Sequence, residues 1–374
     1  MKNYWGCLFI ILSICLSCID KKVEPVSMPM GQKINLDSLD AIEMCSLKAV
    51  RYVPVETTED FLVSDVSKVI CYDSLYYLFD KGGKACFVID GSGKCVNRIH
   101  QIGNGPGEYV DVWDMDVDID RNIWFYDLSM MKLIKYRCNG SRLDFKEYRI
   151  NKQSLFMAVS DSTTCFLSHL YEQGNLTDWL GCYDLESGEY TSLIGNEESW
   201  NLPYLASTYF FRSQDELYYY KKHDKYIYRI VGKETLPFIE LASAHFPTKT
   251  DLEACQEKKS PIPLYYAGKV GEVNALYATT NFVYIGINKI PNLHLFINRE
   301  NKKLYKVAFS EESDLNGRLK LVGATKDHFI GYYQPTPEVL EVLKNRDEKI
   351  KENLATLTEE SNPILVLLTV DRKG

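Results

Sequence analysis

The sequence predicts an all-β fold: a six-bladed β-propeller of four-stranded antiparallel blades. The first observation is a strand, turn and strand pattern that returns about every 40 to 70 residues, because regular self-similarity is typical of propellers and solenoids. The second is composition, since 26 Tyr and 16 Phe stand among Val and Ile, and such side chains favour strands. The third is a lone strand at each end of the repeats, at 49–55 and 362–370.

The second strand of each predicted blade ends in a polar residue. Turn-forming residues such as Asp, Asn and Ser precede all six of these strands. The strands are Leu75–Asp80, Ile123–Asp127, Cys165–His169, Leu217–Lys221, Phe282–Asn288 and Phe329–Gln334. A third strand follows and ends at a turn such as Asp90-Gly91, which is a strong hairpin signal, and a fourth strand leads the chain away. Four antiparallel strands therefore make one blade.

The two lone strands are expected to pair with each other in the last blade. Such a pairing of N- and C-terminal strands closes the ring and removes the need for capping repeats. The same blade is predicted to contain one inserted helix, between Gln334 and Pro363. Thr336-Pro337 suits its cap and first turn. An apolar stripe follows at helical spacing, formed by Val339, Leu340, Leu343, Ile350 and Leu354.

Residues 1–17 have the pattern of an export signal. Lys2 supplies the positive charge, and the apolar run 5–16 is too short to span a bilayer. Cys15-Leu-Ser-Cys18 resembles a bacterial lipobox, so Cys18 is expected to carry the lipid, with ordinary signal cleavage nearby as the alternative. We therefore predict an exported protein of the bacterial cell envelope, anchored on the periplasmic or surface side, with a tether at 18–44 and the propeller at 45–374.

Charge and cysteine spacing exclude some function classes. A net charge of -8 without a basic patch argues against binding to nucleic acid, which needs a positive surface. Eight cysteines follow Cys18 without any Cys-x-x-Cys pair, so a zinc or redox motif is not supported. Several stand inside apolar strands, and we expect mostly buried thiols.

Four segments resemble one protein family. They are Gly103-Asn-Gly-Pro-Gly-Glu-Tyr109, the strand Asp114–Asp118, the strand Ile123–Asp127, and Asn362-Pro-Ile-Leu-Val366. Together they resemble the bacterial six-bladed β-propeller lipoproteins related to NHL-repeat propellers, over about residues 45–370. The resemblance implies the fold and says little about activity.

The motifs that suggest a cofactor have structural explanations. The glycine motif is followed by a strand, whereas a phosphate-binding fingerprint must open a helix. Asp116, Asp118, Asp120 and Asp127 have calcium-loop spacing, but Arg121 replaces the glycine that such a loop needs. The six histidines are scattered. No cofactor is predicted, although calcium and zinc stay open because residues from separate blades can share one metal.

Polar residues are predicted to surround the central channel of the propeller on one face. Each blade contributes one or two of them, and a connector between blades contributes the others. The loop after the second strand and the connector between blades open on that face, and converging polar groups are typical of ligand sites. We call the predicted ligand-binding residues the ring residues, because they are expected to encircle the central channel. They are Asp80, Glu108, Tyr109, Asp127, His169, Lys221, His223, Asn288 and Gln334.

Two function hypotheses follow. The first is a non-catalytic binding or scaffold lipoprotein that presents this face to a peptide, glycan or protein partner. The alternative is a propeller enzyme, a lyase or hydrolase with an acid-based or metal-based site at the channel. No catalytic residue is predicted, because the chain has no Gly-x-Ser-x-Gly elbow and no metal-binding spacing.

Overall fold

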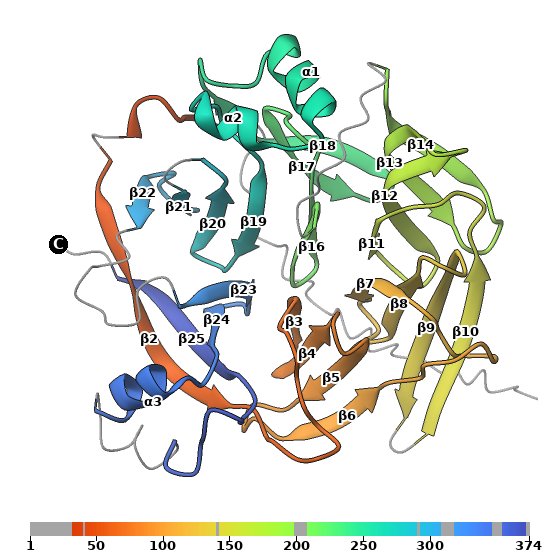
Figure 1. The fold of residues 1–374 in the computed structure, drawn as a ribbon, viewed down its shortest axis with the longest axis vertical. Coiled ribbons are helices and arrows are strands. Elements are labelled where there is room, and N and C mark those ends of the chain that lie inside the picture. The colour runs from red at the N-terminus through yellow and green to blue at the C-terminus, as the bar shows by residue number, and fades with distance from the viewer. Residues whose placement is uncertain are drawn as a thin grey trace, which may run out of the picture.

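The computed structural model describes residues 32–39, 42–139, 142–197, 208–289, 292–307, 318–345 and 354–371. The sheets stand around a central axis, each with an edge strand at the centre and other strands further out, and the largest sheet has both of its edge strands at the centre (Figure 1). An all-β propeller with four-stranded blades is therefore confirmed. The predicted signal peptide and Cys18, the predicted site of lipidation, lie outside the described residues. Within those residues, no helix has the length and apolar character needed to cross a membrane.

Three sheets follow one another in the first half of the chain, each with its strands in chain order. The first contains β3 (Lys68–Tyr72), β4 (Leu75–Asp80), β5 (Ala85–Ile89) and β6 (Cys95–Ile99). The second contains β7 (Val112–Val117), β8 (Ile123–Asp127), β9 (Lys132–Asn139) and β10 (Arg142–Arg149). The third contains β11 (Phe156–Val159), β12 (Thr164–Glu172), β13 (Asn175–Asp184) and β14 (Tyr190–Gly195). Neighbouring strands in each sheet are antiparallel.

The fourth sheet has an extra strand from the N-terminal part of the chain. Its antiparallel strands are β15 (Phe210–Ser213), β16 (Glu216–Tyr220), β17 (Tyr226–Val231) and β18 (Glu234–Ala242). Strand β1 (Gln32–Asn35) pairs in parallel with β18 on the outside. Residues 32–35 fall within the range predicted as a tether, and in the structure they belong to the propeller.

The other eight strands found in the described segments form one sheet. One antiparallel half contains β19 (Val273–Ala278), β20 (Phe282–Ile287), β21 (Leu293–Asn298) and β22 (Leu304–Val307). The other half contains β23 (Lys320–Ala324), β24 (Phe329–Tyr333), β25 (Ile364–Asp371) and β2 (Met44–Pro54). The halves meet through a short parallel pairing of β2 with β22. The N-terminal strand β2 pairs with the C-terminal strand β25 along nearly its whole length, as the sequence predicts.

In the part of the chain that the structure describes, three helices stand outside the sheets. Helix α3 (Pro337–Lys344) lies where the sequence predicts it, and the Thr336 hydroxyl accepts a hydrogen bond from the Val339 amide. It ends at Lys344, and Ile350 of the predicted stripe lies outside the described residues. Helices α1 (Lys249–Lys258) and α2 (Ile262–Tyr266) lie between β18 and β19 and were not predicted. Because α1 buries only Cys255 among its residues, it has no apolar stripe to reveal it.

Side-chain hydrogen bonds connect the innermost strands of neighbouring sheets. Asp114 and Asp116 of β7 accept hydrogen bonds from the backbone amides of Met157 and Val159 in β11. The hydroxyl of Ser213 in β15 accepts one from Ala278 in β19 in the same way. These contacts satisfy amides at the edge of each inner strand, and apolar clusters fill the space between adjacent sheets.

Candidate functional site

Two of the predicted ring residues, Asp80 and Asp127, are fully buried and hold turns. The Asp80 carboxylate accepts hydrogen bonds from the amide and hydroxyl of Ser64, at 2.7 and 2.6 Å, and from the Gly83 amide at 2.8 Å. The Asp127 carboxylate accepts from the amides of Val110 and Met130. Both side chains therefore connect the start of a blade to the turn after its second strand.

The glycine motif is a compact connector that folds on itself. The Glu108 carboxylate accepts a hydrogen bond from the Gly105 amide at 2.7 Å. A side chain at Gly103 would place its Cβ 2.1 Å from that carboxylate, so any other residue there would displace Glu108 from this hydrogen bond. Tyr109 is buried, and its hydroxyl donates to the Lys84 carbonyl at 2.7 Å. Glu108 and Tyr109 therefore stabilise the connector.

The predicted ring residue His169 is almost completely buried. Its backbone lies in the left-handed region, with φ of 56°. Its ring centroid is 4.4 Å from that of Tyr209 and 5.1 Å from that of Trp179. Ser168 Oγ lies 2.9 Å from its Nδ1, whereas its Nε2 has no hydrogen-bond partner among the residues that the structure describes. Burial lowers the pKa of His169 and keeps the ring neutral.

The predicted ring residue His223 joins a buried group of charges with Lys222 and Glu272. Its Nε2 lies 3.8 Å from Glu272 Oε1, and Lys222 Nζ lies 3.7 Å from the same oxygen. Burial lowers the pKa of His223 to about 3, with a further contribution from Lys222. Burial also lowers the pKa of Lys222 to about 8 and raises that of Glu272. Lys222 is thus an electrostatic neighbour of both histidines.

The other three ring residues lie in different places. Lys221 holds its Nζ 5.9 Å from the ring centroid of Trp179. Gln334 is exposed and lines a recess of about 380 Å³ beside α3. Asn288 accepts a hydrogen bond from the Asn274 side chain at 2.5 Å. Of the predicted residues, Asn288 is therefore the one that supports the wall of the large groove described next.

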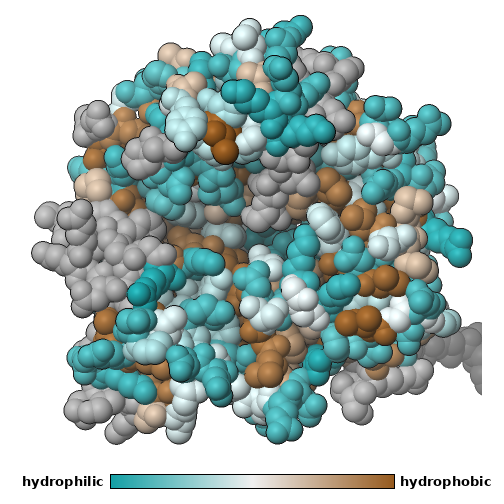
Figure 2. Space-filling model, in the orientation of Figure 1, coloured by the Kyte–Doolittle hydropathy of each residue, from teal (hydrophilic) through white to brown (hydrophobic). Residues whose placement is uncertain are grey.

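A groove of about 960 Å³ lies between the two halves of the eight-stranded sheet and the start of β3. We call it the mouth groove; its lining includes Asp65, Ser67, Lys81, Asn274, Tyr277, Tyr284, His294 and Lys320. It continues into a deeper cavity of about 60 Å³, since Ser67, Lys81 and Tyr277 line both. A hollow is visible near the middle of the molecular face in Figure 2. The mouth groove is the candidate functional site.

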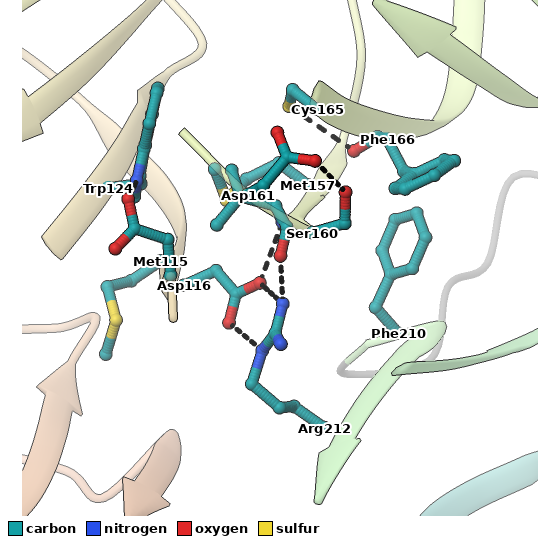
Figure 3. Close-up of polar contacts among 12 residues, drawn as sticks. Met115, Asp116, Trp124, Met157, Ser160, Asp161, Cys165, Phe166, Phe210 and Arg212 are labelled. Atoms are coloured by element: carbon teal, nitrogen blue, oxygen red, sulfur yellow. Dashed lines mark hydrogen bonds and ion pairs between the residues drawn. The ribbon is translucent and has the colours of Figure 1, made fainter. Parts of the chain in front are cut away.

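Charged pairs line the deeper cavity. Lys68 Nζ lies 2.6 Å from Asp114 Oδ1 and also donates to the Met115 carbonyl. Arg212 extends from β15 to Asp116, with Nε–Oδ1 and Nη2–Oδ2 distances of 2.8 and 2.6 Å (Figure 3). All four of these ionisable side chains are mostly buried. Each carboxylate that lines the cavity is thus neutralised by a basic partner.

The Arg212–Asp116 pair also lies between the deeper cavity and a second recess. On its far side, the Tyr72 hydroxyl donates to the Gln214 carbonyl at 2.8 Å and accepts from Arg212. Tyr72 lines this second recess, of about 450 Å³, together with turns that join first and second strands.

Sequence reasoning missed most of the groove residues because they are not strand-end residues. Tyr277 and Tyr284 are register partners on β19 and β20, and their rings are stacked with centroids 6.1 Å apart. His294 comes from β21, and its Nδ1 lies 2.7 Å from the Tyr284 hydroxyl. Lys81 directly follows Asp80, so the predicted position was one residue from a groove residue. No group of three or more metal-binding side chains occurs within the described segments.

Residues 32–369 match the family described as a domain of unknown function, DUF4934. The chain belongs to this family. Among curated proteins, none matches this DUF4934 chain.

Solved structures show the same fold. A Bacteroides fragilis protein, described as presumed to be exported, is 18% identical with a TM-score of 0.71, and the match covers 91% of the DUF4934 chain and 99% of the other. A DUF4221 family member from Bacteroides vulgatus is 10% identical with a TM-score of 0.57, over 88% and 99%. Virginiamycin B lyase from Staphylococcus aureus scores 0.42 at 10% identity, over 87% and 100%, which is too distant to inform on activity.

Proposed function

We propose that this DUF4934 protein is a binding propeller of the bacterial envelope, whose mouth groove receives part of a peptide, glycan or protein partner. One observation carries the proposal: an open groove of about 960 Å³ combines aromatic side chains with amide, hydroxyl and lysine groups. Natural ligand sites have this mixture of apolar walls and a few polar groups, in volumes of about 300–1,000 Å³.

The geometry supports binding better than catalysis by a lyase or hydrolase. A general acid or base needs a side chain that is free to exchange protons with a substrate. In the groove lining, Asp65 accepts a hydrogen bond from Ser67, and the Nδ1 of His294 lies 2.7 Å from the Tyr284 hydroxyl. Asp114 and Asp116, which line the deeper cavity, are held by Lys68 and Arg212 at 2.6 Å. Glu272 has a raised pKa, caused by burial, but it does not line the mouth groove or the cavity below it.

We also propose that the ring has six blades. The two halves of the eight-stranded sheet share only two pairs of residues, Met44 with Lys306 and Cys45 with Val307. Counted as separate blades, these halves join the four other sheets to give six. Strand β2 then completes the last blade by pairing with β25, which would close the ring as the lone terminal strands suggest.

Export and lipid anchoring belong to the same proposal. Their support is the signal-like segment at 1–17, the lipobox-like Cys15-Leu-Ser-Cys18, and the fold neighbour described as presumed to be exported. Replacing Cys18 with Ser should move the protein from the membrane fraction to the soluble fraction of bacterial cells. A Cys7→Ser variant, at a cysteine of the signal-like segment outside the lipobox-like residues, is the matched control and should stay with the membrane. Unchanged membrane association of Cys18→Ser would contradict lipidation at this position.

The binding role is tested by blocking the mouth groove. Ser67 is exposed and lines both the groove and the deeper cavity, so Ser67→Trp should fill the entrance without disturbing the core. Ser187 lies in an exposed turn after β13, and Ser187→Trp is the control. Calorimetric titration with cellotetraose, tetragalacturonic acid and hexaglutamate should give binding that Ser67→Trp abolishes and Ser187→Trp preserves. Equal binding by both variants would overturn the proposal.

A further inference from the structure

The mouth groove has more positive than negative side chains. Lys81 and Lys320 both line it, and neither forms an ion pair within the described part of the chain. Lys81 Nζ instead lies 3.7 Å from the ring centroid of Trp113, and Lys320 Nζ lies 5.8 Å from that of Tyr332. Asp65, the one carboxylate among the described residues of the lining, accepts a hydrogen bond from Ser67 at 2.9 Å. The two ammonium groups are therefore available to an anionic ligand.

An aromatic ladder forms one wall of the groove. The rings of Tyr277 and Tyr284 are nearly parallel, at 4°, and those of Tyr284 and His294 are also stacked, at 14°. Tyr284 is buried, whereas Tyr277 and His294 are half-buried and line the groove. The faces of such rings are electron-rich and attract the slightly positive C–H groups of a ligand. Because burial lowers the pKa of His294, this ring is neutral and adds no charge to the wall.

A glycine keeps polar groups accessible beside this ladder. A Cβ at Gly286 would lie 2.5 Å from Asn274 Oδ1 and 3.1 Å from the Tyr284 hydroxyl. Asn274 uses its amide nitrogen to donate to Asn288, so its oxygen is left to accept. The wall thus offers an amide oxygen and a phenol next to the stacked rings, which suits a ligand rich in hydroxyl groups.

Tyr284 and His294 stand on strands that offer no free edge to a peptide. Strands β20 and β21 are each paired on both sides, with β19, with each other and with β22. The groove is also lined by β19 and β23, the two edge strands of this sheet, so strand addition by a peptide is the competing mode of binding there, and the hexaglutamate titration tests it. Around Tyr284 and His294, side chains provide the recognition, through charge, hydroxyl contacts and ring stacking.

We propose that the mouth groove binds an acidic oligosaccharide, whose carboxylates contact Lys81 and Lys320 and whose sugar rings pack along the ladder of Tyr277, Tyr284 and His294. This inference rests on the proposed binding function and names its ligand class. Burial lowers the pKa of Lys81, so a nearby carboxylate also restores favourable surroundings for its charged form.

The test compares tetragalacturonic acid with its fully methyl-esterified form, which has the same sugar chain without the charges. Calorimetric titration at low ionic strength should show binding of the acid and at least about tenfold weaker binding of the ester, because a charge-assisted hydrogen bond contributes about 1.5–3 kcal/mol. Lys81→Met and Lys320→Met should each weaken the acid about tenfold, and added salt should weaken it further.

Lys146→Met is the matched control. Lys146 is exposed on β10, with its Nζ 4.7 Å from the ring centroid of Tyr148, so it has a similar cation and ring contact away from the groove. Its removal should leave the affinity for tetragalacturonic acid unchanged. Thermal melting of each variant verifies that it is folded, and Lys81→Gln repeats the test with a polar side chain.

Three results would contradict the proposal that the ligand is an acidic oligosaccharide. They are equal affinity for the acid and the ester, lysine variants that bind the acid as tightly as the natural protein, and binding of hexaglutamate without binding of any sugar. Binding of a neutral sugar that Ser67→Trp abolishes would leave the binding function intact and refute only the acidic ligand. Binding that Ser67→Trp leaves unchanged would show that the mouth groove is not the binding site.

Discussion

The buried histidine His223 should make the folded protein sensitive to acid. Burial lowers its pKa from 6.5 to about 3 in the folded state, so the unfolded chain takes up the proton first as the pH falls. Stability that is complete above pH 6.5 is therefore lost progressively below it. Each pH unit in that window costs about 1.4 kcal/mol, so this side chain alone removes about 2 kcal/mol by about pH 5.

Urea unfolding at several pH values measures this loss. In His223→Asn the titrating ring is gone, and asparagine tolerates the left-handed backbone at this position, where φ is 55°. The free energy of unfolding of the variant should fall by about 2 kcal/mol less than that of the natural protein between pH 7 and 5. The neighbouring Glu272 opposes the trend in both proteins, because its raised pKa favours the folded state in acid.

The exposed histidine His245 supplies the control, since His245→Asn should follow the natural protein across the whole pH range. The absolute stability of His223→Asn does not matter here, because the prediction concerns the difference between two pH values. If His223→Asn and the natural protein lose the same free energy between pH 7 and 5, the burial of a neutral histidine is not the cause.

Three further outcomes are expected. Arg212→Met should lower the free energy of unfolding by about 3–5 kcal/mol because it leaves the buried Asp116 unpaired, and adding Asp116→Asn should recover part of the loss in urea unfolding. Tyr109→Phe should cost about 1–3 kcal/mol in the same assay, since the Lys84 carbonyl and the Gln101 amide lose their partner. The thiols of Cys86 and Cys165, whose pKa burial raises, should resist maleimide labelling until the protein is unfolded, as mass spectrometry would show.

The strands were predictable because each one is short, apolar and bounded by turn residues. Leu75–Asp80 and Ile123–Asp127 coincide with β4 and β8 to the residue. The roles of the terminal aspartates were not predictable from the same pattern. A polar residue at a strand end can face a ligand or hold a turn, and only the positions of Ser64 and Val110 show that Asp80 and Asp127 do the latter.

The mouth groove could not be predicted from the sequence, for a related reason. Its aromatic wall depends on strand register, which sets Tyr277 opposite Tyr284. Its lysines come from segments far apart in the chain, one after β4 and one at the start of β23. Spacing along the sequence contains neither kind of information, whereas the fold brings these side chains into one lining.

The pairing of β2 with β25 has a consequence for how the chain reaches its native state. Strand β2 lies near the N-terminal end of the propeller and β25 near its C-terminal end, so their pairing closes a loop of about 310 residues. Such a contact is entropically costly and forms late. We expect the sheets whose strands are consecutive in the sequence to fold first, and β2 to pair with β25 after them. A chain that crosses a membrane before folding would meet this requirement readily, because all its strands become available in one compartment.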